Sequence, residues 1–281
     1  MTHVTRHSEQ SRSLDADGGP PMREVTPGLW LVGIGPGDID SMSLEAVEVA
    51  RGCDHRFLEG YTALLPPAQE ELLAERVGEW TRLMRPAVEN PDELLELART
   101  SAVALLVVGD PLQATTHVDL QLRARERGIS CEVVHGISIT TIVTGALGLQ
   151  SYRFGRQVTL AYPYGDYLPT SPLELVLANR QQNLHSLMLL DLDPSGMGEA
   201  EQQPMSPADA MAVLGRAAEK IGVDIEGWTM VLCSDMGTSE QRIVCGTPEQ
   251  ISSVEGGRIH CLVIPGSLDE LEELALERWR A

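Results

Sequence analysis

The chain has 281 residues, 43% of them hydrophobic, which is enough for one large globular domain or two domains of medium size. It carries 41 acidic and 21 basic residues, and the net charge of −20 argues against nucleic acid or an anionic membrane as the main partner. No apolar run approaches the roughly 20 residues that a membrane-spanning helix needs. We therefore expect a protein that binds neither nucleic acid nor a membrane.

The first 27 residues contain Ser, Asp, Gly, Pro and His but no apolar segment. This composition is typical of a disordered tail, not of a secretory signal, which has an apolar centre.

The cysteines and histidines do not form the pattern of a disulfide framework or a metal site. The five cysteines are odd in number, lie far apart and include no CxxC pair, and the seven histidines include no HxH or HExxH pair. We expect reduced thiols, a cytoplasmic location and no bound metal.

Strands and helices are predicted to alternate over the first half of the chain. Short apolar runs predict the strands, and helical spacing behind Ser43 or behind a proline predicts the helices. Such alternation predicts a mostly parallel sheet. In chain order, the predicted elements are a strand over 29–33, helices over 43–50, 66–77 and 90–100, a strand over 102–108, a helix over about 116–127 and a strand over 131–134.

The apolar segment 136–149 predicts a helix that begins near Ser138 and leads into a second domain. We therefore expect an N-terminal α/β domain over residues 28–135 and a C-terminal α/β domain over residues 136–281. In the second domain, the predicted elements are strands over 158–162, 187–192, 229–233 and 260–265, capped helices over 169–184 and 206–222, and a loop over 193–204.

A glycine-rich turn, GIGPGD (33–38), follows the first strand. It matches neither the dinucleotide-binding pattern nor the P-loop pattern, and Asp38 stands where a third glycine would be needed. A carboxylate there would repel a pyrophosphate, so a dinucleotide or nucleoside-triphosphate site is disfavoured. A tight turn without a ligand explains these residues about equally well.

Residues 109–117 read GDPLQATTH and follow the predicted strand over 102–108. Gly109 allows the backbone to turn sharply and to come close to a ligand. Asp110 is an acid at the carboxyl end of a buried strand, where open α/β sheets bind ligands, and no turn or cap requires it. It predicts a ligand with a positively charged group.

Other polar residues near the strand ends have structural explanations. Thr116 and Asp119 have the spacing of a helix cap, and His117 alone is more often a packed histidine than a catalyst. HGISI (135–139) combines a strand end, a glycine and a helix-start serine, so its free N–H groups either receive a ligand or are simply capped. From the residues alone we predict a small-molecule site at the strand ends.

Several segments together resemble the diphthine synthases, a family within the tetrapyrrole methylase superfamily, from about residue 29 to about residue 268. The GDP-x-x-ATTH run followed by YxFG and PTSP is highly specific, whereas GIGPGD is shared across the superfamily. The segments that carry the resemblance are LEGYTALL (58–65), VVGDPLQATTHVDLQLRARERGI (107–129), HGISI, GLQSYRFGRQVTLAYP (148–163), LPTSPLELVLANRQQNLHSLMLLDL (168–192) and HCLVIPG (260–266).

The resemblance implies the class III methyltransferase fold, in which two α/β domains hold S-adenosylmethionine (SAM) in the cleft between them, usually in a homodimer. Diphthine synthases methylate the amino group of the 3-amino-3-carboxypropyl extension on a histidine of translation elongation factor 2, and archaeal members are expected to trimethylate it to diphthine. Glu59 and His117 are candidates for the acceptor side, with no general base assigned. The family's cofactor positions correspond here to Pro36, Asp110, Gln113, Ser138, Ile139, Leu190, Ser234 and His260.

The chain departs from the family pattern in two loops. Pro36-Gly37 stands where the family usually has leucine, and HGISI replaces His-Ala-Pro-Ser-Ile or His-Asn-Ala-Ser-Ile. Two alternatives therefore stay open. One is methylation of a precorrin-like tetrapyrrole, which GIGPGD favours, and the other is a SAM-binding paralogue without catalytic activity.

Overall fold

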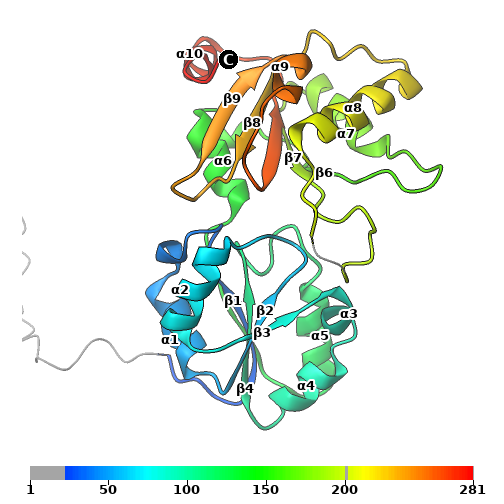
Figure 1. Cartoon of the computed structure of the whole chain (residues 1–281). Helices are drawn as coiled ribbons and strands as arrows, with labels where there is room; N and C mark the ends of the chain where they lie inside the picture. The colour runs from blue at the N-terminus through cyan, green and yellow to red at the C-terminus, as the bar shows by residue number, and fades with distance from the viewer. Residues whose placement is uncertain (1–22, 200–201, 281) are drawn as a thin grey trace, which may run out of the picture.

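A computed structural model describes residues 23–199 and 202–280, so most of the predicted disordered tail lies outside the described residues. The described chain forms two α/β domains, each built on a five-stranded sheet. In Figure 1 the earlier half of the chain lies below and the later half above. The predicted α/β architecture is confirmed. None of the helices in the described part of the chain has the length and apolar character needed to span a bilayer.

Residues 23–27, the end of the predicted tail, contact the first sheet's domain. The Arg23 guanidinium lies 5.0 Å from the centroid of the Trp30 ring and pairs with Glu45 and Glu132. The Trp30 indole N–H donates to the carbonyl of Thr26 at 3.0 Å.

The first sheet has five parallel strands, in the spatial order β3 (Thr81–Leu83), β2 (His55–Glu59), β4 (Ala102–Val107), β1 (Gly28–Gly33) and β5 (Cys131–Val134). The sheet carries helices on both faces, and a 3-10 turn, η1 (Ile39–Ser41), follows β1. One face is covered by α1 (Leu44–Gly52) and α2 (Pro67–Val77), and the other by α3 (Arg85–Glu89), α4 (Asp92–Ala98) and α5 (Val118–Glu126) (Figure 1). Central strands buried on both faces read as continuous apolar runs, which is why AVALLV in β4 was predictable.

The connections that follow β1 and β4 leave the sheet on opposite faces. These two strands are neighbours, and α1 follows β1 on one face whereas α5 follows β4 on the other. In open α/β sheets, ligands bind outside the carboxyl ends of strands at such a switch point. GIGPGD and GDPLQATTH both begin there.

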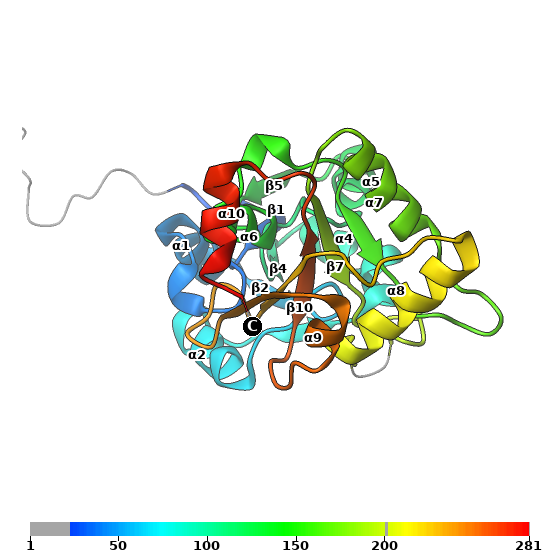
Figure 2. The same cartoon turned by 90° about the horizontal axis from the view of Figure 1, so that it is seen from above.

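The second sheet has the order β6 (Val158–Leu160), β7 (Ser186–Leu190), β10 (His260–Ile264), β8 (Met230–Ser234) and β9 (Arg242–Gly246). Its β6–β7 pair is parallel and its other pairs are antiparallel. A 3-10 turn, η2 (Ser151–Arg153), precedes β6. Figure 2 shows the flanking helices: α7 (Ser171–Gln181), α8 (Pro207–Ile221) and α9 (Pro248–Ser252) pack on one face, and α6 (Ile139–Leu147) and α10 (Glu270–Glu277) on the other.

Local capping follows the sequence in some places and not in others. The Ser43 hydroxyl accepts a hydrogen bond from the N–H of Ala46 at 3.0 Å, as predicted. The predicted cap at Thr116 is wrong, because His117 is the N-cap of α5 and no side chain caps this helix. Thr116 contributes only its carbonyl, which accepts from the N–H of Asp119, while the Asp119 carboxylate pairs with an arginine one turn later.

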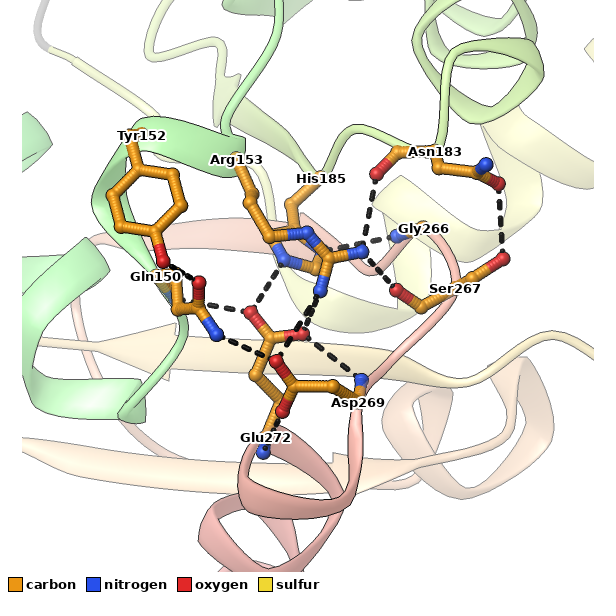
Figure 3. Close-up of polar contacts among 9 residues, drawn as sticks. All are labelled: Gln150, Tyr152, Arg153, Asn183, His185, Gly266, Ser267, Asp269 and Glu272. Atoms are coloured by element: carbon orange, nitrogen blue, oxygen red, sulfur yellow. Dashed lines mark hydrogen bonds and ion pairs between the residues drawn. The ribbon is translucent and has the colours of Figure 1, made fainter.

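A buried polar network anchors the C-terminal helix α10 (Figure 3). The fully buried Glu272 carboxylate accepts from the N–H groups of Gln150 (3.1 Å) and Asp269 (3.2 Å) and from His185 Nε2 (3.1 Å), and it pairs with Arg153. Burial alone would raise the pKa of Glu272, but these hydrogen bonds outweigh burial and lower the pKa. The network joins η2, the residue before β7 and α10, segments far apart in the sequence.

Candidate active site

Three strand ends of the first sheet converge on the backbone of Gly109. The Gly109 N–H donates to the carbonyl of Gly35 at 2.7 Å, and the Gly35 N–H donates back at 3.3 Å. An added Cβ would lie 2.7 Å from the Gly109 oxygen at Gly33 and 2.2 Å from it at Gly136. Only glycine allows this close approach, so the glycines of GIGPGD and HGISI have a packing role.

A pocket lies at these strand ends, between the two sheets. Its space is about 910 Å³ including the open mouth, within the roughly 300–1,000 Å³ typical of small-molecule sites. The first domain contributes the loops after β1, β2 and β4, and the second contributes the ends of β7 and β8 and the start of β10. Seven predicted cofactor positions line it: Pro36, Asp110, Gln113, Ser138, Ile139, Leu190 and His260.

Asp110 joins the loops that follow β4 and β5. Its Oδ1 accepts from the N–H of Leu112 at 2.9 Å, and its Oδ2 lies 2.7 Å from His135 Nδ1 and 3.3 Å from the N–H of Gly136. The side chain is largely buried and still lines the pocket. The turn after β4 therefore does use this acid, through the contact with Leu112, and Asp110 also forms part of the pocket wall.

Two residues of the GDPLQATTH loop that line the pocket have a positive φ. Gly109 has a φ of +85°, and a Cβ built there would meet no atom within 4 Å. Ala114 also lies in the pocket wall with a φ of 55°, in the left-handed region that costs a non-glycine residue free energy. Strain of this kind gathers at ligand sites, because the surrounding structure holds the loop in place.

The N-terminus of α6 opens into the pocket. The Ser138 hydroxyl accepts from the N–H of Thr140 at 3.3 Å, as a helix cap at the predicted position. Ser138, Ile139 and Thr140 all lie in the pocket wall, so the first turn of α6 faces the site.

Ser234 lies behind the pocket wall, not in it. Its buried hydroxyl is 2.7 Å from Nδ1 of His260, which does line the pocket. The carboxylate of Asp235 accepts from the N–H groups of Arg258 and Ile259 at 3.1 Å and so fixes the approach to β10. Burial lowers the pKa of His260, which keeps its ring neutral at neutral pH.

Comparison with known proteins assigns this architecture. Residues 28–252 match the family model for Tetrapyrrole (Corrin/Porphyrin) Methylases. A diphthine synthase from Methanospirillum hungatei is 35% identical over 254 residues, covering 89% of this chain and 97% of that protein. The chain belongs to the diphthine synthase family. It is also 36% identical to the diphthine synthase of Methanoregula boonei, covering 89% of this chain and 98% of that protein.

A solved crystal structure of a diphthine synthase has the same fold. It matches with a TM-score of 0.80 and 30% identity, covering 90% of this chain and 95% of that one. The predicted two-domain class III fold is therefore confirmed, and the chain is a methyltransferase.

In this methyltransferase, Glu59 and His117 lie beneath the pocket wall. Each is only 1% exposed, and neither belongs to the residues that line the pocket. Burial raises the pKa of Glu59 to about 7, against the effect of a hydrogen bond from Thr62. Burial also lowers the pKa of His117. Both groups therefore favour their uncharged forms.

The pocket wall also contains residues that sequence reasoning did not select. Thr62, Ala63 and Leu64 follow β2, a strand that no pattern predicted. They belong to LEGYTALL, so the family resemblance was a signal for them. Leu192 and Met236 also line the pocket from the second domain. Leu192 ends the resemblance segment 168–192, whereas Met236 stands in no distinctive motif.

Proposed function

We propose that this methyltransferase uses SAM to methylate the amino group of 3-amino-3-carboxypropyl-histidine on translation elongation factor 2, giving diphthine. The observation that carries the proposal is the convergence of seven predicted cofactor positions on one pocket between the domains. Its relatives from two methanogens bear the name diphthine synthase, which supports the same reaction.

The residues of the pocket fit SAM, a ligand with an apolar adenosine, a sulfonium and an amino-acid end. Leucine, valine and isoleucine side chains form much of the wall and would contact the adenosine. The negative charge of Asp110 would attract a cationic group, and the first turn of α6 would receive an anionic one. The backbone at Gly109 leaves room for close approach, because a Cβ there would project into open space.

The protein's part in methyl transfer is to align the acceptor and to keep water out. SAM supplies an electrophilic methyl group, and transfer requires the acceptor lone pair to lie in line with it. Alignment of this kind can contribute several kcal/mol to the lowering of a barrier. Walls from two domains, as in this pocket, would hold the two reactants in a fixed orientation.

A groove that shares Leu64 and His260 with the pocket is the proposed path for the acceptor. Two arginines, Arg82 and Arg258, line it. Arg82 pairs with Glu70 at 2.6 Å, whereas no carboxylate among residues 23–199 and 202–280 lies within salt-bridge distance of Arg258. The acceptor extension carries a carboxylate, which suits the guanidinium of Arg258.

The test is methylation of purified elongation factor 2 that carries the extension. With SAM and this enzyme, the factor should gain mass in whole methyl groups. Methyl transfer to a corrinoid precursor but not to the factor would favour a precorrin-type activity instead. SAM binding without transfer to either acceptor would indicate a non-catalytic paralogue.

The proposed substrate also bears on location and assembly. A translation factor is a cytoplasmic protein, so the proposal places the enzyme in the cytoplasm. A homodimer is expected from the family resemblance and stays a prediction.

A further inference from the structure

Two buried polar atoms under the pocket face each other without a hydrogen bond. Glu59 ends β2, and His117 begins α5 after the neighbouring strand β4. Glu59 Oε1 and His117 Nε2 lie 3.7 Å apart. Neither atom has a hydrogen-bond partner in the described part of the chain. A buried polar atom without a partner costs free energy, so this pair calls for a functional explanation.

The hydrogen bonds around the pair define where a proton can sit. His117 Nδ1 is 3.0 Å from the carbonyl of Pro111, which can only accept, so Nδ1 carries the hydrogen. The Nε2 lone pair of the neutral ring therefore faces Glu59. The other carboxylate oxygen, Oε2, accepts from the Thr62 hydroxyl at 2.6 Å. One proton can thus lie between Glu59 Oε1 and His117 Nε2.

Few other charges act on this proton. Arg85 on α3 lowers the pKa of Glu59, but less than burial raises it, to about 7. Arg85 stacks on Tyr61 at 5.2 Å, and burial, Glu59 and Glu89 raise the pKa of that phenol, which stays neutral. Burial lowers the pKa of His117, with the Pro111 carbonyl opposing it. Burial therefore favours the uncharged form of each group, and the raised pKa of Glu59 allows its carboxyl group to gain or lose a proton near neutral pH.

Thr62 connects this pair to the pocket. It lies in the pocket wall beside Ala63 and Leu64, and its hydroxyl donates to Glu59. A hydroxyl can accept a proton on one side while it gives up its own on the other. The acceptor amine is an ammonium ion in water and must lose a proton before each methyl transfer, including after the first and second methyl groups are attached.

We propose that Thr62, Glu59 and His117 form a proton relay that deprotonates the acceptor amine. This inference rests on the proposed function. The acceptor N–H bond breaks as its proton moves to Thr62 Oγ1, and the Thr62 proton moves to Glu59 Oε2. After the carboxyl group rotates, this same proton lies between Glu59 Oε1 and His117 Nε2. The amine keeps its electron pair for the methyl group, and the pair gains one proton, which returns to solvent after release of the product.

Kinetic tests separate the relay from a purely structural role. Glu59→Gln keeps the size of the side chain but cannot accept the proton, and Thr62→Val removes the hydroxyl. Both should lower kcat by about 100-fold or more. SAM affinity by calorimetry should stay unchanged in Glu59→Gln, because Glu59 lies beneath the pocket wall and does not line the pocket. Thr62→Ser should restore most of the rate. Thr81→Val, the same change on an exposed β3 residue, is the control and should keep the wild-type rate.

The pH profile gives a second signature. The kcat of the wild type should rise with pH and level off near neutrality, where the pair loses its proton. In Glu59→Gln the plateau should move to alkaline pH, because deprotonation then depends on the amine itself. A Glu59→Gln enzyme with the wild-type rate and pH profile would overturn the relay.

A spectroscopic test does not depend on turnover. Infrared difference spectra of the free protein should show a protonated-carboxyl band that disappears as the pH rises through about 7 and is absent from Glu59→Gln. Absence of this band in wild-type protein that methylates its acceptor would overturn the relay alone. Wild-type protein that shows the band but methylates no acceptor would contradict the proposed function and, with it, the reaction that the relay serves.

Discussion

A substitution at Gly109 tests both the backbone conformation of the loop and the proposed position of SAM. Its φ of +85° is in the region that favours glycine, and a Cβ there would project into the open pocket without touching protein. Gly109→Ala therefore has two separable effects: backbone strain, and a methyl group in the space proposed for SAM.

The strain has a predictable size. An L-residue in the left-handed region costs about 1–2 kcal/mol. For a chain of this length that corresponds to a fall in Tm of roughly 2–8 °C. The added methyl group should weaken SAM binding at least about tenfold, equivalent to about 1.4 kcal/mol. Thermal unfolding and titration calorimetry with SAM measure the two effects independently.

Gly128 provides a matched control. It follows α5 with a φ of +67°, its added Cβ would also meet no atom within 4 Å, and it is not part of the pocket wall. Gly128→Ala should lose a similar amount of stability and keep the wild-type SAM affinity. If Gly109→Ala loses the same stability but binds SAM as tightly as the wild type, the cofactor does not approach this backbone and the reasoning is refuted.

Three further substitutions test other parts of the site and fold. Asp110→Ala should weaken SAM binding at least about tenfold by calorimetry, since it removes a charge and frees two loops; unchanged affinity would remove Asp110 from the site. Arg258→Ala should raise the KM for the modified factor with little change in SAM affinity, and an unchanged KM would exclude it from acceptor binding. Glu272→Ala should lower the free energy of unfolding in urea by about 3–5 kcal/mol, against less than about 0.5 kcal/mol for the exposed Glu273→Ala. The pKa of Glu272 is lower in the folded protein than the usual value of about 4.5, so the ionised carboxylate stabilises the fold above that value. This stabilisation is lost as the pH falls through the folded pKa. The stability difference between wild type and Glu272→Ala should therefore shrink in acid.

Most strands of the fold could be read from the sequence, including the edge strands β5 and β6, and three could not. Residues 102–108 formed an unbroken apolar run because β4 is buried on both faces by helices. The strands β2, β3 and β9 were not predicted. The β3 strand has three residues at the sheet edge, two of them exposed, so it lacks both length and alternation. Likewise, β2 begins with the exposed His55 and the half-buried Arg56.

Site residues could be predicted from the sequence where a residue's chemistry differed from what its local structure requires. Asp110 stood out because a buried strand has no need of an acid at its end, and the structure puts it in the pocket wall with three protein partners. Ser234 was predicted only from the family resemblance. It contacts His260, which lines the pocket, but does not line the pocket itself. The Glu59–His117 pairing joins residues 58 positions apart, one at the end of β2 and the other at the start of α5, and no local pattern encodes such a contact.

The most direct test of the central claim is the mass of elongation factor 2 bearing the amino-carboxypropyl extension, measured after incubation with the purified enzyme and SAM. The acceptor is validated by methylation with another diphthine synthase. The structure and the family predict a SAM-dependent gain of whole methyl groups on the extension, absent from the unextended factor and diminished with Gly109→Ala. No mass gain on the validated acceptor would contradict the proposed function.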